Sequence, residues 1–293
     1  MSRLPIDELN RRCQKPDHQQ VGNWMARRVS RPAALRLTRV IAPWGATANL
    51  TTLAAWGVGL AAAAALAWGS IGGWLAGAVL LQLWYLLDHV DGQLARLRGT
   101  ASLDGVQLDY LMHHTLNLTV PLGIGCGLFA ATLEPPWALL GLGGGMGLLL
   151  ITLHHDARYK AMIQRLKRVH GRLQAIGGGG ARPTAQPPLP RHPVRLAAWT
   201  ARKMCEAHVV MNAVTLVAVA QWLAGDTALL LGRVYLAALA PAALAVAAWT
   251  LVRSQHRHEA ETEFAACFHP APGDDLRFLD GWWMVDRREG EPS

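Results

Sequence analysis

The sequence is poor in charge for its length. Of its 293 residues only 16% are charged, whereas 52% are hydrophobic. A soluble protein of this size carries more charge, so the composition favours a membrane protein. Residues 41–87 hold no charged side chain, residues 110–155 hold one and residues 207–252 hold two. A buried soluble core could imitate one such stretch, but three of them favour membrane-spanning segments.

Cysteine is also scarce. The four residues Cys13, Cys126, Cys205 and Cys267 lie far apart without the spacing of metal ligands, and we assign them no role. The first apolar run begins only at Ile41, after a charged and proline-containing leader, so no secretory signal peptide is predicted.

The three charge-poor stretches predict six transmembrane helices. Each is about twice the roughly 20 residues that one helix needs to cross a bilayer. Each also has a break near its middle, at 69–73, 134–136 and 224–227. We therefore expect an all-α integral membrane fold with helices over about 47–68, 73–96, 105–132, 137–159, 200–223 and 228–251.

The basic residues predict the orientation. All Lys and Arg except Arg233 fall before residue 41, in the turn after the second helix, within 158–203, or after 252. Because such residues stay on the cytoplasmic side, we predict a multi-pass protein of the cell membrane with both termini in the cytoplasm. Attraction to anionic headgroups explains the net charge of +8, and no nucleic-acid partner is expected.

Three parts are predicted along the chain. Residues 1–40 form a cytoplasmic segment with an amphipathic interfacial helix over about 21–40, bent or restarted at Pro32, although an irregular basic leader also fits. Residues 41–252 form the six-helix catalytic domain, in which the Gly- and Pro-rich range 160–198 is a flexible cytoplasmic linker. Residues 253–293 form a cytoplasmic tail to which we assign no chemistry.

Acidic residues gather at the second turn of this arrangement. Asp88 and Asp91 are three residues apart on one predicted helix, and Asp109 and His113 are four apart on the next, so each pair shares a face. A hairpin brings the pairs together at the membrane edge, where such groups are costly unless a cation neutralises them. Mg²⁺ or Mn²⁺ fits these ligands. A salt-bridge network with nearby arginines, or helix capping, are the structural alternatives.

Small residues share the faces that carry the acids. Gly92 follows Asp88 by four residues, and Gly105 precedes Asp109 by four. The absence of bulky side chains would let a nucleotide diphosphate approach the backbone while its phosphates meet the cations and Arg96.

The complete pattern of eight positions resembles a known signature. The motif D-x2-D-G-x2-A-R-x8-G-x3-D-x3-D of the CDP-alcohol phosphotransferases, also called CDP-alcohol phosphatidyltransferases, matches at seven positions: Asp88, Asp91, Gly92, Ala95, Arg96, Gly105 and Asp109. Every spacing is kept, and the eighth position holds His113 instead of Asp.

The resemblance implies a fold and a site. It implies an amphipathic helix on the cytoplasmic side followed by six transmembrane helices, in a homodimer. It also implies that the acids bind two divalent cations at a cytoplasmic active site, with these residues as ligands: Asp88, Asp91, Asp109 and, at the position of the fourth acid, His113. The remaining motif residues, together with two that match part of a second family pattern, would border the nucleotide: Gly92, Ala95, Arg96, Gly105, Asn49 and Thr52.

The eighth position also holds the proposed base in this family, and here it is His113. A neutral imidazole can accept a hydroxyl proton and can bind metal, although the lost negative charge weakens the second cation. The resemblance therefore predicts transfer of a phosphatidyl group from CDP-diacylglycerol to a polar alcohol, with release of CMP, in phospholipid biosynthesis. A soluble CDP-alcohol with diacylglycerol as acceptor fits as well. The alternatives are a degenerate nucleotide- or cation-binding membrane scaffold and a transporter.

Other polar residues allow weaker predictions. Glu206, His208 and Asn212 either line an acceptor pocket with Arg202 or Lys203, or form interhelical hydrogen bonds. Asp104 is predicted to cap the third transmembrane helix, with compensation for the missing fourth acid as the alternative. A glycine-rich region at 141–147 predicts close helix packing, within or between subunits.

Overall fold

The structure is a computed structural model that describes residues 5–14, 22–175, 189–226 and 228–287. Contacts divide the chain into two compact units. The first comprises Met1–Leu149 with Pro188–Val246, and the second comprises Leu150–Pro187 with Ala247–Ser293. Two long helices contribute residues to both units.

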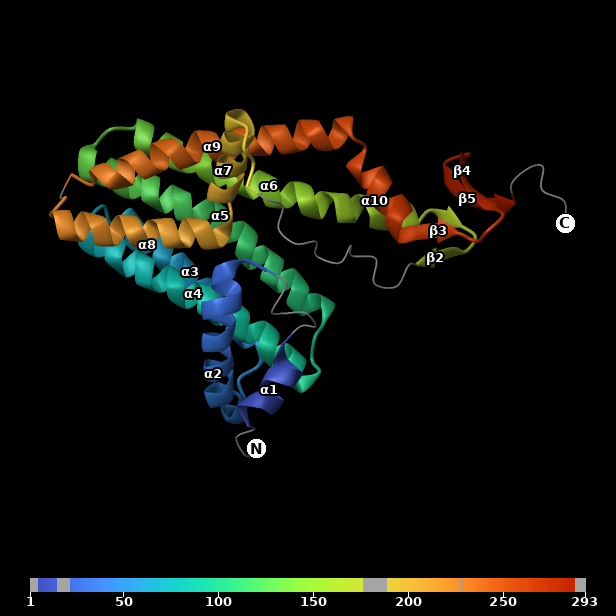
Figure 1. The fold of residues 1–293 in the computed structure, drawn as a ribbon, viewed down its shortest axis with the longest axis horizontal. Helices are drawn as coiled ribbons and strands as arrows, with labels where there is room; N and C mark the ends of the chain where they lie inside the picture. Colours follow the sequence, from blue (N-terminus) through green and yellow to red (C-terminus); the bar gives the residue numbers. More distant parts are fainter. Residues whose placement is uncertain (1–4, 15–21, 176–188, 227, 288–293) are drawn as a thin grey trace. The chain divides into compact units, whose positions relative to one another are not determined.

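Among the residues that the structure describes, six helices are long and apolar enough to cross a membrane, which confirms the prediction of a multi-pass membrane protein (Figure 1). They are α3 (Ala48–Ala67), α4 (Ile71–Arg98), α5 (Leu103–Thr132), α6 (Pro136–Leu166), α8 (Ala207–Ala224) and α9 (Leu230–His256). The breaks between them fall at the three predicted places. Only backbone-satisfied elements such as helices cross a bilayer, so these six segments form the spanning part.

Side-chain caps set the starts of the first three spans. The hydroxyl of Thr47 accepts from the Leu50 amide, and Ser70 and Ser102 cap α4 and α5 in the same way. The prediction that Asp104 caps α5 is therefore wrong. Asp104 lies inside the first helical turn, where its negative charge still interacts favourably with the helix dipole.

Helix α3 packs against both helices that carry the acidic motif. Glycines on α5 make the approach possible, because a Cβ at Gly123 or Gly127 would collide with the backbone of Ala63 or Leu66 on α3. The predicted glycine-rich region of α6 is used for packing within the chain. A Cβ at Gly141 would meet the backbone of α5 at Gly125.

The N-terminal part is helical over most of the predicted range 21–40. A π-helix, η1 (Ala26–Ser30), runs directly into α2 (Arg31–Ile41), and Pro32 stands in the first turn of α2. The backbone is helical at both Ser30 and Arg31, so the chain does not restart at Pro32. A helix that the sequence did not predict, α1 (Ile6–Cys13), packs against α2 and α4.

The predicted fifth span begins differently. Its first residues belong to a separate amphipathic helix, α7 (Pro193–Met204), and α8 begins only after a break at Cys205 and Glu206. The predicted linker 160–198 contains the end of α6, two short strands and the start of α7, whereas its glycines at 177–180 lie outside the described residues.

The second unit contains two small sheets, of three and two strands, and α10 (Glu259–Cys267). Strand β5 (Trp282–Arg287) pairs with β4 (Asp274–Leu279) and with β1 (Val169–His170), and β2 (Leu173–Ala175) pairs with β3 (Phe268–Pro270). The guanidinium of Arg165 lies over the rings of Phe264 and Trp283 and pairs with Glu261. Glu261, Phe264 and Trp283 all lie far from Arg165 in the sequence, so these contacts tie the C-terminal tail to the end of α6.

Candidate active site

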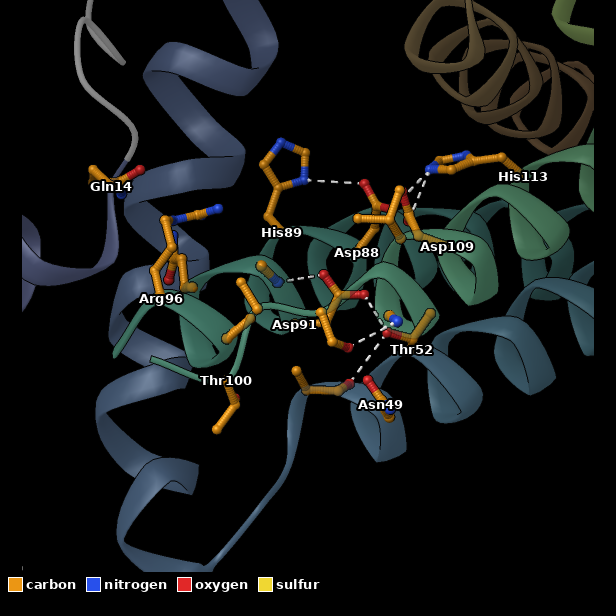
Figure 2. Close-up of a pocket in the computed structure, with 18 of the residues that line it drawn as sticks. Gln14, Asn49, Thr52, Asp88, His89, Asp91, Arg96, Thr100, Asp109 and His113 are labelled. Carbon is orange, nitrogen blue, oxygen red and sulfur yellow. Dashed lines mark hydrogen bonds and ion pairs between the residues drawn. The ribbon is translucent and has the colours of Figure 1, made fainter. Parts of the chain in front are cut away.

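A cavity of about 430 Å³ lies where α3, α4 and α5 meet, in the first unit (Figure 2). All ten predicted site residues line it, and they come from the three helices in turn: Asn49 and Thr52; Asp88, Asp91, Gly92, Ala95 and Arg96; Gly105, Asp109 and His113. The volume falls within the range of small-ligand pockets. The ten predicted residues therefore line one continuous cavity.

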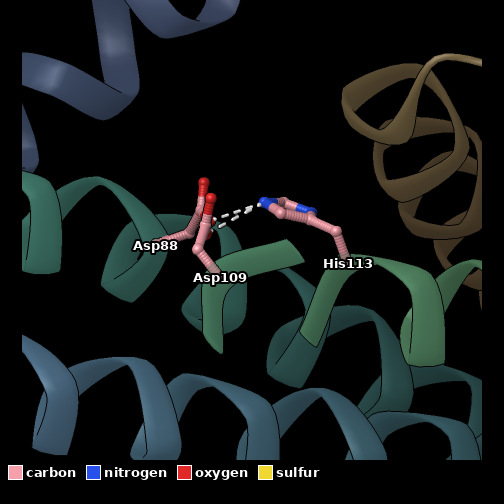
Figure 3. Close-up of side chains that lie close together, drawn as sticks. All are labelled: Asp88, Asp109 and His113. Carbon is pink, nitrogen blue, oxygen red and sulfur yellow. Dashed lines mark ion pairs between the residues drawn. The ribbon is translucent and has the colours of Figure 1, made fainter. Parts of the chain in front are cut away.

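Three of the four proposed metal ligands converge. The Nε2 atom of His113 lies 3.0 Å from Oδ1 of Asp88 and 3.4 Å from Oδ1 of Asp109 (Figure 3). One potential ligand atom from each residue lies within 4.8 Å of the others. The ring of His113 also meets that of Trp84 edge-on, with centroids 5.7 Å apart. The imidazole thus takes the place of a fourth acid beside two carboxylates.

Asp91 lies deeper and has different partners. It is buried, and its Oδ2 atom accepts a hydrogen bond of 2.7 Å from the hydroxyl of Thr52 on α3. Its other oxygen contacts the amide of Gly92. Thr52 is only 3% exposed, so solvent cannot easily replace its hydroxyl. A buried carboxylate needs such donors, and this contact explains the presence of Thr52 at the helix start.

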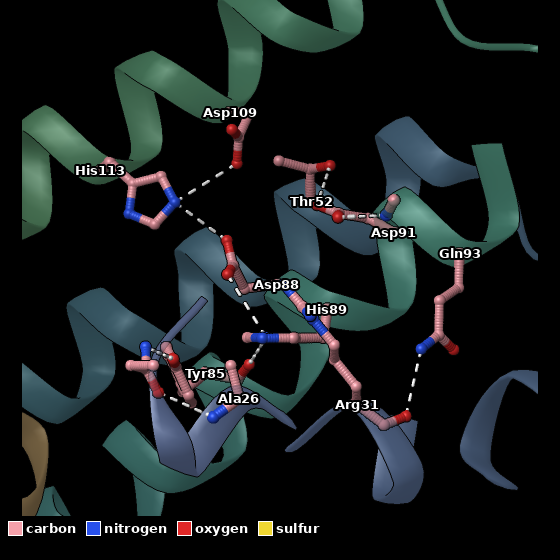
Figure 4. A network of polar contacts seen from close by, with 12 residues as sticks. Ala26, Arg31, Thr52, Tyr85, Asp88, His89, Asp91, Gln93, Asp109 and His113 are labelled. Atoms are coloured by element: carbon pink, nitrogen blue, oxygen red, sulfur yellow. Dashed lines mark hydrogen bonds and ion pairs between the residues drawn. The ribbon is translucent and has the colours of Figure 1, made fainter. Parts of the chain in front are cut away.

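His89 is a cavity residue that the motif does not predict. Its Nδ1 atom lies 2.8 Å from the carbonyl of Tyr85 and 3.6 Å from Oδ2 of Asp88 (Figure 4). The hydroxyl of Tyr85 in turn accepts from Asn23. The motif allows any residue at position 89, so the sequence alone gives no reason to assign His89 to the site.

Arginine and glycine shape the other end of the cavity. The Nε atom of Arg96 donates to the backbone carbonyl of Cys13, and the guanidinium lies over Gly92. A Cβ at Gly92 would come within 3.2 Å of Nη1 of Arg96, and one at Gly105 within 3.3 Å of Oδ1 of Asn49. Small residues at both positions keep the cavity open beside these polar groups.

The residues suggested for an acceptor pocket lie elsewhere. Glu206, His208 and Asn212 are absent from the residues that line the described cavity. Asn212 instead accepts a hydrogen bond of 3.2 Å from Gln82, which joins α8 to α4. Lys203 pairs with Glu206 at 2.6 Å. For Asn212 the interhelical alternative is therefore confirmed.

The donor set fits a divalent cation. Carboxylate oxygens and one imidazole nitrogen suit Mg²⁺ or Mn²⁺, and Asp88, Asp109 and His113 could each turn one atom towards a common centre. Asp91 lines the same cavity but faces Thr52 and Gly92. The arrangement suits chemistry on a phosphate, because acids that could hold cations line the same pocket as a guanidinium.

The fold and the site together define a multi-pass membrane protein with an acidic cavity built by its first three spanning helices. Residues 46–173 match the family model of the CDP-alcohol phosphatidyltransferases. This part of the chain is thus similar to that family, whose members are transferases that use divalent cations and act in phospholipid biosynthesis. The matched range contains all ten predicted site residues.

The chain is also similar to proteins of known structure. One match is the crystal structure of phosphatidylinositol phosphate synthase from Mycobacterium tuberculosis with CDP-DAG bound. The two chains are 18% identical, the alignment covers 72% of this chain and 94% of the other, and the TM-score is 0.42. Among curated proteins, no match was found.

Proposed function

We propose that this protein transfers a phosphatidyl group from CDP-diacylglycerol to a polar alcohol and releases CMP. The convergence of Asp88, Asp109 and His113 in one cavity carries the proposal, because it keeps the spacing of the family motif and supplies both cation ligands and a proton acceptor. The position of the cavity on membrane-spanning helices suits a donor whose acyl chains stay in the bilayer.

The proposed reaction is a direct displacement. Nε2 of His113 would be free to accept a proton once Asp88 and Asp109 turn their oxygens from the imidazole to the cations. The acceptor hydroxyl then gives its proton to this nitrogen, and its oxygen forms a bond to the β-phosphorus of the donor. The bond between that phosphorus and the CMP oxygen breaks, and CMP leaves with the electron pair. Arg96 faces the phosphates from the opposite end of the cavity. When bound, divalent cations, two by our proposal, neutralise charge on the phosphoryl oxygens.

His113 cannot serve both proposed roles at once. Its Nε2 atom is the one that faces the two carboxylates, and a nitrogen that holds a cation has no lone pair for a proton. We assign the base role to His113 and cation binding to Asp88, Asp91 and Asp109. Near the nucleotide we place the other motif residues and the start of α3: Gly92, Ala95, Arg96, Gly105, Asn49 and Thr52.

Orientation and assembly complete the proposal. We place both termini and the site on the cytoplasmic side, because nearly all Lys and Arg lie in the segments that would be there. We propose a homodimer from the family resemblance. Crosslinking in membranes tests the dimer, and the accessibility of a C-terminal tag in sealed vesicles tests the orientation.

Release of CMP tests the function directly. Purified protein in lipid nanodiscs is incubated with Mn²⁺, CDP-diacylglycerol and a panel of alcohols that includes glycerol phosphate, inositol phosphate and serine, and the lipid product is identified by mass spectrometry. Asp109→Asn serves as the inactive control. Turnover of a soluble CDP-alcohol with diacylglycerol would reverse the donor assignment. CDP binding without CMP release from either donor type would favour the degenerate scaffold, to which the missing fourth acid also points.

A further inference from the structure

The cavity wall includes residues that lie outside the family-matched range 46–173. Gln14 and Arg31 line it, and Gln14 directly follows α1. Figure 2 shows Gln14 and Arg96 at one end of the cavity and His113 at the other. The N-terminal segment therefore contributes to the end of the site that is distant from the proposed base.

The contact between Arg96 and the end of α1 is directional. The Nε atom of Arg96 donates to the backbone carbonyl of Cys13, which fixes the plane of the guanidinium. The two terminal nitrogens then lie over Gly92, at 3.2 and 3.4 Å from the place of its missing Cβ. A planar guanidinium held in this way presents its remaining donors to a phosphate with little further loss of freedom.

Apolar contacts hold α1 in place. Leu9 is 2% exposed and Cys13 is fully buried, and they form a cluster with Leu35 of α2 and with Leu97 of α4. Ile6, on the same helix, is 40% exposed. One face of α1 thus packs against α2 and α4, beside Leu97, which directly follows Arg96 in the sequence.

We propose that α1 positions Arg96 for the diphosphate of the nucleotide donor, so that docking of α1 and binding of the nucleotide support each other. The proposal rests on the function proposed above, because it needs a nucleoside diphosphate in the cavity. A ligand that binds the docked state more tightly must also stabilise that state. Arg96 remains the residue that contacts the ligand, and α1 acts through it.

The first test is CDP binding by the full-length protein, measured by titration calorimetry with Mn²⁺ present. Leu9→Asp places a charge in the buried cluster and should undock α1, so we expect its Kd for CDP to rise about tenfold, the effect of losing one well-placed hydrogen bond to a charged group. The matched control is Ile6→Asp, which alters an exposed position of the same helix and should stay within about twofold of wild type. In turnover, KM should rise more than kcat falls.

The second test keeps α1 intact and uses Cys13 as a reporter. In a variant with Cys126, Cys205 and Cys267 replaced by Ala, a maleimide can react only at Cys13. Burial excludes the reagent, and it also raises the pKa of the Cys13 thiol to about 11, so labelling at neutral pH requires α1 to leave its place. We expect saturating CDP to slow labelling by about fivefold or more.

The outcomes separate this inference from the proposed function. If wild-type protein binds CDP, but Leu9→Asp binds it equally well and CDP leaves the labelling rate unchanged, α1 does not position Arg96. If Leu9→Asp does not fold, the labelling experiment alone decides. If the wild-type protein binds no CDP at all, the proposed function fails, and this inference fails with it.

Discussion

Replacement of His113 tests the chemistry most directly. Its Nε2 atom lies 3.0 and 3.4 Å from the carboxylate oxygens of Asp88 and Asp109, so an alanine removes the group nearest both acids. If His113 accepts the proton, His113→Ala should lower kcat by about 10²–10⁴-fold, the usual contribution of a positioned general base, or about 2.7–5.5 kcal/mol in the barrier. Additional Mn²⁺ should not restore the lost kcat.

A role in metal binding predicts a different result. Loss of one ligand raises the Mn²⁺ concentration needed for half-maximal rate, and saturating Mn²⁺ then restores turnover. The assay is therefore CMP release measured over a full Mn²⁺ titration for each variant. His114→Ala is the matched control, since His114 is the next residue of α5 and is absent from the described residues that line the cavity.

A carboxylate at position 113 supplies the complementary test. His113→Asp restores the family motif and offers both a proton acceptor and a cation ligand, so we expect it to keep substantial activity and to need less Mn²⁺ than wild type. Normal kcat for His113→Ala at saturating Mn²⁺ would refute the assignment of His113 as base.

Three further predictions concern the same protein. Thr52→Val removes the buried hydrogen-bond donor to Asp91 and should lower activity at limiting Mn²⁺ by about 10- to 100-fold, because a hydrogen bond to a charged group contributes about 1.5–3 kcal/mol. The control Thr51→Val removes a hydroxyl that bonds to the Thr47 carbonyl and should leave activity unchanged. Chelation of divalent cations should abolish CMP release, and added Mg²⁺ or Mn²⁺ should restore it; release that persists in chelator contradicts the cation site. Hydrogen bonds from Arg165 lower the pKa of Glu261, so this pair stabilises the second unit above the ordinary carboxyl pKa, and the contribution is lost as pH falls through the lowered value. Limited proteolysis should show faster cleavage of the C-terminal segment at about pH 4 than at pH 7, and a smaller pH effect in Arg165→Gln.

The sequence predicted the spans and the acidic site because both depend on local patterns. Long charge-free stretches leave few alternatives to membrane helices, and helical spacing alone puts Asp109 beside His113. Fixed motif spacing then specified the partners on the preceding helix. The hydrogen bond between Thr52 and Asp91 joins residues far apart in the chain, and only the family resemblance placed Thr52 near the nucleotide.

The errors arose where several residues could play one part. Ser102 and Asp104 are both good N-caps, and the choice depends on the first residue of α5, which the sequence determines only to within a few residues. The break between α7 and α8 has no Gly or Pro to mark it, and it falls beside the ion pair of Lys203 and Glu206. Backbone contacts leave even less trace, because any residue in place of Cys13 offers the same carbonyl to Arg96.

That backbone contact has a consequence for the resting site. A flexible arginine near exposed carboxylates would tend to pair with them, and each would then block the other from the substrate and the cations. Here Arg96 donates to a neutral carbonyl, while Asp88 and Asp109 contact His113. The guanidinium of Arg96 and the carboxylates of Asp88 and Asp109 thus have separate partners in one cavity, so a phosphate ligand could contact both. The N-terminal helix α1 lies outside the family-matched range 46–173, and its last residue supplies the carbonyl that Arg96 contacts.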